Sequence, residues 1–179
     1  MAGFKHFMET QPINSAKKSL LCVLAERWWD TTHTFHIADV EMMIMPYDMY
    51  RLTGLRIDGI IPTFSAFPAR VHSDREYLGV SLGASYANLP SLSRAFAEAP
   101  QTTIEEATRM AQGFVLYLIG STLDYNTSQT IPVRWLHLLV DFQQTAQYNW
   151  GGVAFANLYA GCDAISRVAT TSFVGPWRI

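Results

Sequence analysis

The sequence predicts a mainly α fold: a compact helical domain around a buried central helix, with one small β-hairpin near the N-terminus. Two patterns support this fold class. Residues 102 to 123 are apolar around most of a helical circumference, and residues 31 to 45 alternate with a period of two. The composition agrees, because 49% of the residues are hydrophobic and only 16% are charged, as in a well-buried globular chain.

The central helix has a recognisable start. Thr102 or Thr103 can cap it, and Glu105 or Glu106 can complete a capping box. The apolar positions of its first half lie on one stripe: Ile104, Ala107, Met110, Ala111 and Phe114. This pattern predicts an amphipathic first half.

The second half of this helix should be its most buried part. Every residue from 114 to 119 is apolar, so we expect other elements to surround this segment. Gly113 and Gly120 weaken a helix, and each is expected to mark a place where a neighbouring backbone comes close.

The N-terminal third begins with a weakly patterned arm over residues 1 to 13. A helix should follow, capped by Asn14 or Ser15, and it is expected to cover the central helix. Its apolar residues share one face: Leu20, Leu21, Leu24 and Trp28. Trp28 and Trp29 close this helix and are expected to be core anchors.

The alternating stretch from 31 to 45 predicts a hairpin with its turn at Ala38 and Asp39. In that register Phe35 opposes Met42 and Ile37 opposes Val40. One face of the hairpin is then expected to point to the core: Phe35, Ile37, Met42 and Ile44. Ala-Asp is an unusual two-residue turn, so a longer loop remains an alternative.

Local signals define the remaining helices. Pro46 to Thr53 should form a short helix that Gly54 ends in the left-handed conformation. Residues 56 to 101 should be a loop-rich insertion with one short strand and a helix over 91–97. Pro132 should open a helix with Trp135, Leu136, Leu139 and Phe142 inside, and Asn149 should cap a helix over 150–166.

Length and charge restrict the functional classes. A chain of 179 residues is expected to be a single domain, and its apolar end at 176–179 suggests a domain cut from a longer polypeptide. The net charge is −2, and all three lysines lie within the first eighteen residues. Cys22 and Cys162 are expected to be buried, reduced thiols. No apolar run is long enough for a membrane span or a signal peptide, which predicts an intracellular protein that is not secreted.

Five segments, taken in order between about residues 25 and 159, resemble the plant mobile domain family, also labelled aminotransferase-like. They are ERWWDTTHTFHI, EMMIMPYDMYRLTGLRIDG, GFVLYLIGSTL, PVRWLHLLVDF and YNWGGVAFANLY. The resemblance implies a plant nuclear protein related to retrotransposons. It further implies a link to transposable-element silencing, genome stability and meristem maintenance, with a phosphatase-like protein partner.

The residues argue against catalysis. Pyridoxal phosphate enzymes need a lysine in the cofactor pocket, and this chain has none after residue 18. His33 and His36 are three apart on a predicted strand and should point to opposite faces, which disfavours a zinc site. Serine-hydrolase and phosphate-binding loops are absent from the sequence. We therefore expect no catalytic residues, no cofactor and no metal.

Six residues are candidates for contact with a partner: Arg134, Trp135, Asp141, Trp29, His33 and His36. Arg134, Trp135 and Asp141 recur in the family pattern. Arg134 can pair with a core carboxylate or carbonyl groups while Trp135 packs inside, or the two can form an interface patch, where Arg and Trp are common.

Two functional classes remain. The first is a protein-interaction or scaffold domain. The second is a nucleic-acid-binding domain, because residues 46 to 55 look like the first helix and turn of a helix-turn-helix. The low net charge and the missing recognition helix favour the first class. The sequence leaves the oligomeric state open.

Overall fold

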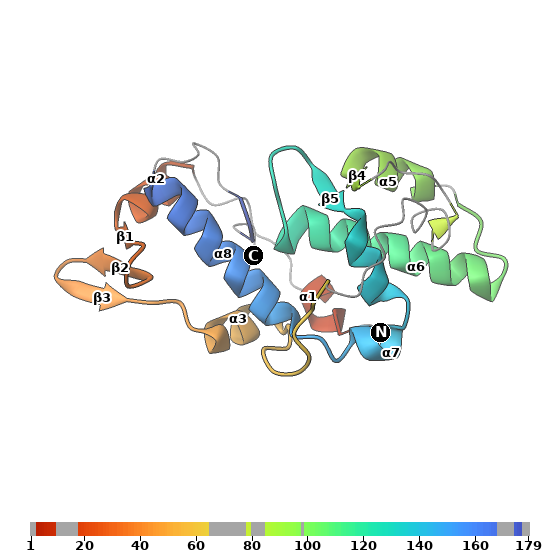
Figure 1. Cartoon of the computed structure of the whole chain (residues 1–179), viewed down its shortest axis with the longest axis horizontal. Coiled ribbons are helices and arrows are strands. Elements are labelled where there is room, and N and C mark those ends of the chain that lie inside the picture. The colour runs from red at the N-terminus through yellow and green to blue at the C-terminus, as the bar shows by residue number, and fades with distance from the viewer. Residues whose placement is uncertain are drawn as a thin grey trace.

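The structure, a computed structural model, describes residues 3–9, 18–64, 78–79, 85–97, 99–167 and 174–176. The fold is mainly α, as predicted, but elongated rather than compact (Figure 1). The helices are α1 (Lys5–Glu9), α2 (Lys18–Glu26), α3 (Pro46–Thr53), α5 (Leu89–Ala97), α6 (Ile104–Leu118), the π-helix η1 (Ile119–Leu123), the 3-10 helix η2 (Val133–Leu139), α7 (Phe142–Thr145) and α8 (Trp150–Ser166).

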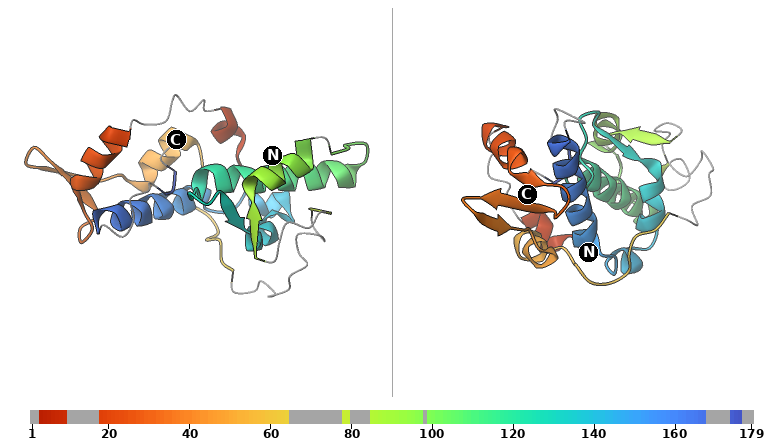
Figure 2. Two further views of the ribbon diagram at one scale, coloured as in Figure 1. Left: turned by 90° about the horizontal axis from the view of Figure 1, so that it is seen from above. Right: turned by 60° about the vertical axis from the view of Figure 1, so that its left-hand side comes forward.

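One end of the molecule carries α2, a small sheet and α3 around α8, and the other end carries α5 and α6 (Figures 1 and 2).

Strands contribute more than the single hairpin that the sequence predicted. A three-stranded antiparallel sheet has the order β1 (Trp28–Trp29), β2 (Thr34–Ile37) and β3 (Val40–Met42). A second sheet pairs β4 (Tyr86–Asn88) with β5 (Thr130–Pro132). The sequence predicted one short strand within residues 56 to 101, and β4 lies there; β1 and β5 were not predicted, because strands of two or three residues are too short to show a period.

The start of α6 confirms the predicted capping box. The hydroxyl oxygen of Thr103 accepts a hydrogen bond from the Glu106 amide, and the Glu106 carboxylate accepts one from the Thr103 amide. The predicted stripe, however, is exposed at its two ends, where Ile104 is 89% and Phe114 is 49% exposed, and only partly buried at Met110 and Ala111. The buried face is formed by Gln112, Gly113, Val115, Leu116, Ile119, Gly120 and Leu123.

Both glycines of this segment lie at close contacts, although the neighbours are side chains. A Cβ at Gly113 would lie 2.5 Å from the Phe96 ring. A Cβ at Gly120 would lie 2.8 Å from Leu89 and 3.0 Å from Ile131. These glycines therefore let α6 and η1 approach α5 and β5.

Helix α2 packs on α8, and the expectation that it covers the central helix is wrong. Its buried residues are Leu21 and Ala25, whereas Leu20 is exposed. Cys22 is also exposed, which corrects the prediction of two buried thiols; Cys162 is buried and both cysteines are free. The predicted caps Asn14 and Ser15 lie outside the described residues, as do the C-terminal residues from 177.

The other helices follow their local signals closely. Helix α3 starts at Pro46 and ends at Gly54, whose φ of 66° is left-handed. Helix α8 spans the predicted residues, and the Asn149 side chain caps it. Pro132 instead ends β5, and the predicted helix behind it is the 3-10 helix η2 followed by the short α7.

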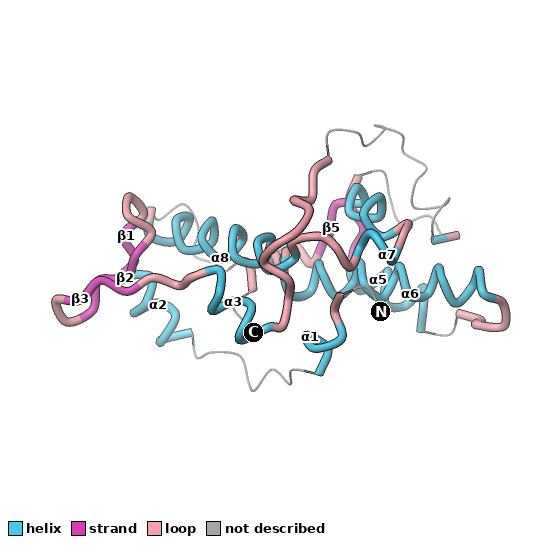
Figure 3. Tube along the Cα trace, turned by 90° about the horizontal axis from the view of Figure 1, so that it is seen from below, coloured by secondary structure: helices cyan, strands magenta, loops and turns pink. Residues whose placement is uncertain are grey.

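Buried side chains form two clusters. The main one unites α6, η1, η2 and α8 with Phe4 and Phe7 of the N-terminal arm, and the Phe4 ring lies 5.2 Å from the Trp150 ring. The smaller cluster joins Trp28 and Phe35 to Cys162 of α8. Helix α8 thus connects the sheet end to the main core (Figures 1 and 3). Within the described part of the chain, no helix is both long enough and apolar enough to span a lipid bilayer.

Candidate functional site

The β2–β3 hairpin projects from one end of the molecule and carries exposed apolar side chains (Figure 1). We call these residues, together with those of the adjoining α3, the hairpin surface: Ile37, Val40, Met42, Met43, Met45, Tyr47, Tyr50 and Leu52. Each is between 38% and 63% exposed. Soluble proteins rarely expose so many large apolar residues in one short segment without a partner, so this is the candidate site.

The geometry of the hairpin follows from its turn. Ala38 and Asp39 have φ values of 49° and 65°, both in the left-handed region that a tight two-residue hairpin turn requires. The predicted register is confirmed, with Phe35 opposite Met42 and Ile37 opposite Val40.

The predicted orientation of this face is correct only for Phe35 and Ile44. Phe35 is buried and Ile44 is partly buried, whereas Ile37 and Met42 are exposed. Ile37 lies at the tip, beyond the small cluster on α8, and Met42 lies on the edge strand β3 opposite Phe35, so neither is covered. Long-range packing decided this outcome, because the alternation of residues is the same at all four positions.

The base of the hairpin is held on α8 by polar contacts. The Trp28 Nε1–H donates to Asp163 Oδ1 at 2.7 Å, and His33 Nε2 lies 3.3 Å from Asp163 Oδ2. The Tyr159 ring stacks on His33, and the Tyr159 hydroxyl donates to the Ile44 carbonyl. These contacts fix the sheet against the helix and leave the tip free for contact.

The second face of the sheet is more polar. The Trp29 ring, 55% exposed, lies 4.5 Å from the His36 ring, and His36 Nε2 lies 3.6 Å from a carboxylate oxygen of Glu41. Nearby, Arg167 donates a hydrogen bond that lowers the pKa of the Asp30 carboxyl. The core-anchor interpretation is therefore correct for Trp28 and wrong for Trp29.

The six candidate residues do not form one cluster. Trp29, His33 and His36 lie at the sheet, whereas Arg134, Trp135 and Asp141 lie on η2 and at the start of α7. Trp135 is only 6% exposed, and its indole N–H donates to Asp124 Oδ2 at 3.2 Å. The role of these six residues in contact with a partner therefore remains a prediction.

Arg134 and Asp141 have local contacts. The Arg134 side chain is exposed, and its guanidinium lies 4.5 Å from the centre of the Phe64 ring, a cation–π contact. Its charge also acts on the partly buried Asp124 carboxylate and opposes the rise of that pKa. Asp141 caps α7 by accepting hydrogen bonds from the amides of Gln143 and Gln144. Both positions therefore have a structural role.

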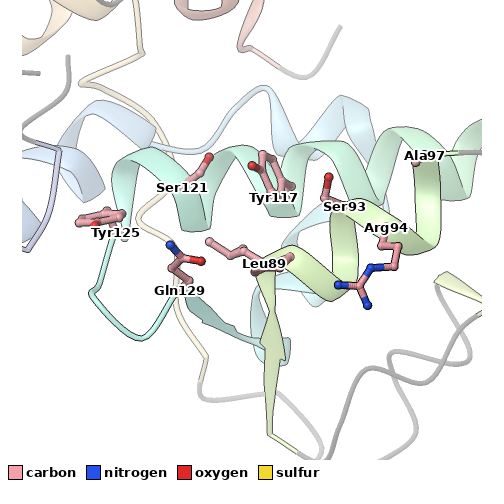
Figure 4. A pocket seen from close by; sticks show the side chains of 9 residues that line it. Leu89, Ser93, Arg94, Ala97, Tyr117, Ser121, Tyr125 and Gln129 are labelled. Atoms are coloured by element: carbon pink, nitrogen blue, oxygen red, sulfur yellow. The ribbon is translucent and has the colours of Figure 1, made fainter. Parts of the chain in front are cut away.

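A second feature is an open groove of about 460 Å³ between α5 and α6–η1 (Figure 4). Its lining includes Ser93, Tyr117 and Ser121, together with the apolar Leu89. The guanidinium of Arg94 extends away from the hydroxyl groups of Ser93 and Tyr117 (Figure 4). Arg94 is the one charged residue among the described residues that line the groove. Because the lining gathers no cluster of charged groups, we give the groove less weight than the hairpin surface.

Two observations concern metal ligands and nucleophiles among the described residues. They contain no group of three or more His, Cys, Asp or Glu side chains that could hold a metal ion. Burial raises the pKa of the Cys162 thiol to about 12, so this cysteine is protonated at neutral pH and is a poor nucleophile.

Sequence reasoning missed most of the hairpin surface. It assigned Ile37 and Met42 to the core and did not single out Met43, Met45, Tyr47 or Leu52. A signal was present in EMMIMPYDMY, a run rich in Met and Tyr. Met-rich surfaces adapt to partners, and Tyr is enriched at interfaces.

Comparison with known proteins agrees with the resemblance of the five segments. A family model described as plant mobile domain matches residues 3–179. In Arabidopsis thaliana, Protein MAIN-LIKE 2 is 34% identical over 97% of this chain and 27% of its own length, and Protein MAINTENANCE OF MERISTEMS is 32% identical over 88% and 34%. Serine/threonine-protein phosphatase 7 long form homolog is 30% identical over 88% of this chain and 12% of its own length.

The chain thus spans between 12% and 34% of the length of these three relatives. No solved structure matches it significantly. Because the family model matches nearly the whole chain, this protein belongs to the plant mobile domain family.

Proposed function

We propose that this chain is a non-enzymatic protein-interaction domain of a plant nuclear, transposon-related protein that acts in transposable-element silencing and genome stability. The hairpin surface supports this proposal most directly, because it places eight exposed large apolar residues on the hairpin and the adjoining helix α3. A partner that covers it would remove apolar area from water, which is the main driving force of association.

The proposed partner is a phosphatase-like protein. The family resemblance implies such a partner, and one relative is named as a serine/threonine-protein phosphatase 7 long form homolog. That relative carries a region similar to this chain. We propose that the domain binds a protein of the phosphatase-like class in trans.

Nucleic-acid binding is the alternative, and the structure favours it less. Helix α3 and Gly54 have the form of the first half of a helix-turn-helix, but residues 55 to 64 contain no helix that could enter a groove. The fixed charges of residues 37 to 52 are the acidic Asp39, Glu41 and Asp48 and the basic Arg51, which leaves an acidic excess. Such an excess disfavours contact with phosphate.

The experiment compares two variants of the purified chain by calorimetry against a purified plant phosphatase-like protein. Met42→Lys with Leu52→Lys places charge on the hairpin surface, and Ile104→Lys is the control, because Ile104 is an equally apolar, exposed residue on α6. We expect the double variant to weaken binding at least tenfold, and the control to bind as the unchanged chain does.

Absence of binding, or equal loss in both variants, would refute the proposal. Duplex and single-stranded DNA at two salt concentrations form the second arm of the experiment. Tight, salt-sensitive DNA binding would establish the alternative instead.

A further inference from the structure

The outer edge of β3 is an open strand edge. The His36 amide donates to the Arg27 carbonyl at 2.8 Å, so the backbone groups of His36 point toward β1. His36 is opposite Glu41 in the β2–β3 ladder, and this pair is therefore a non-hydrogen-bonded pair. The amide and carbonyl of Glu41 must point the other way, away from β2, and β3 is the last strand of the sheet.

The side chains along this edge define what can pair with it. Val40 and Met42 lie on one face of the sheet, and Glu41 lies on the other beside His36. The Glu41 side chain is 60% exposed, so a cation can approach it from the open side. No lysine or arginine occurs between residues 31 and 50.

We propose that the β3 edge binds an extended segment of a partner protein in which a lysine or arginine, flanked by apolar residues, lies opposite Glu41. The partner backbone pairs with the Glu41 amide and carbonyl, its cation contacts the Glu41 carboxylate, and its apolar side chains cover Val40 and Met42. This inference rests on the proposed function and specifies the chemistry of the partner.

A second copy of this chain is the less suitable occupant. Symmetric antiparallel pairing centred on Glu41 would place the two Glu41 carboxylates directly opposite each other on one face. Like charges in that position are destabilising, whereas a basic residue there is stabilising. Charge complementarity therefore favours a basic strand from a different protein.

The test uses synthetic peptides of alternating apolar residues around one central lysine and monitors the Glu41 amide of the labelled chain by NMR titration. Three probes are compared: the lysine peptide, the same peptide with a central glutamate, and the lysine peptide with N-methylation at the lysine. We expect the lysine peptide to bind at least tenfold more tightly than both others. Equal binding of the three would overturn the proposal.

Protein variants give an independent check. Glu41→Lys should abolish binding of the lysine peptide and create binding of the glutamate peptide. Glu41→Gln should weaken binding of the lysine peptide with little effect on folding. The control Glu105→Lys changes an exposed acid on α6 and should leave the titration unchanged. Unchanged binding by Glu41→Lys would refute the inference.

The outcomes separate this inference from the proposed function. Binding of the phosphatase-like protein that depends on Met42 and Leu52 but not on Glu41, with no peptide preference, would overturn strand pairing only. Absence of any protein binding would overturn the proposed function. Dimerisation seen by sedimentation equilibrium and removed by Glu41→Lys would assign the edge to a second copy and overturn the inference.

Discussion

Asp124 is a partly buried carboxylate whose titration should affect stability. It lies just after η1, and burial raises its pKa above the ordinary 3.8, although the Trp135 indole N–H and the nearby Arg134 charge act in the opposite direction. A raised pKa in the folded state means that the folded chain binds the proton more tightly than the unfolded chain.

The contribution of Asp124 to stability is therefore fully present below pH 3.8 and is lost as the pH rises through the folded pKa. In Asp124→Asn the side chain cannot titrate but can still accept the Trp135 hydrogen bond. We expect the unfolding free energy of the variant, relative to the unchanged chain, to increase as the pH rises through this window. Urea denaturation across that range measures the difference, and a constant difference would contradict the assigned pKa direction.

The two cysteines should differ strongly in reactivity. Cys22 is exposed on α2, whereas burial raises the pKa of Cys162 to about 12. At about pH 8, a thiol reagent such as DTNB should modify one cysteine per native chain quickly and the second only after unfolding. Cys22→Ser should remove the fast phase, and rapid labelling of two native thiols would show that Cys162 is accessible.

At the scale of elements, Asn149 has two functions. Its side-chain oxygen accepts from the Gly152 amide at 2.6 Å and caps α8, and its Nδ2 donates to the Ile57 carbonyl at 2.8 Å. Asn149 therefore joins the helix to the extended segment after α3.

Asn149→Ala should lower the unfolding free energy by about 2 kcal/mol, roughly 1 for the cap and roughly 1 for the tertiary hydrogen bond. Asn149→Asp keeps the cap but places a carboxylate oxygen against the Ile57 carbonyl, so repulsion between the two oxygens should add to the loss of the tertiary hydrogen bond. Asn88→Ala is the matched control, because Asn88 accepts from the Ser91 amide at the start of α5 and its loss should be about 1 kcal/mol. Equal effects of Asn149→Ala and Asn88→Ala in urea denaturation would show that the contact with Ile57 adds nothing.

The beginning of α6 illustrates a limit of element-level patterns. Ile104 and Phe114 share a stripe that any amphipathicity rule assigns to the interior, and both are exposed. The buried face includes Gln112, whose side chain donates to the Leu139 carbonyl at 3.2 Å. A polar residue with a buried partner can replace an apolar one at a helix interface, and helical periodicity alone does not detect such a partner.

At the scale of the whole molecule, the two clusters of buried residues should differ in local stability. The cluster at the sheet is small and depends on the hydrogen bond from Trp28 to Asp163, while the main cluster contains most of the buried apolar residues. Regions with few buried contacts open more readily.

Trp28→Phe removes the indole N–H donor and leaves the Asp163 oxygen without that hydrogen bond. The unfolding free energy of the sheet end should fall by roughly 1 to 3 kcal/mol. Hydrogen exchange should accelerate at residues 34 to 42 and remain unchanged at residues 115 to 123. Trp135→Phe is the matched control, since it removes the indole donor to Asp124 in the main cluster. It should accelerate hydrogen exchange at residues 115 to 123 and leave residues 34 to 42 unchanged. If both variants accelerate exchange at the same amides, the domain opens as one cooperative unit.

The boundaries of most helices and the family of this protein could be predicted from the order of its residues alone. The Thr103–Glu106 capping box, the Asn149 cap and the Gly54 stop were all predictable, because each depends on hydrogen bonds or backbone conformations within about four residues. The register of the hairpin followed from the two-residue turn for the same reason. The order of five short segments was sufficient to indicate the plant mobile domain family.

Which faces of the helices and of the hairpin are covered depends on contacts between distant parts of the chain. Trp28 meets Asp163, a residue 135 positions away, and this contact locates the sheet on α8 and leaves the hairpin tip beyond it. Burial of α2 against α8, exposure of Cys22 and the surface position of Met42 all follow from such long-range contacts. Periodicity identifies an apolar face but not its neighbour, so residues that a pattern assigned to the core became the surface on which the proposed function depends.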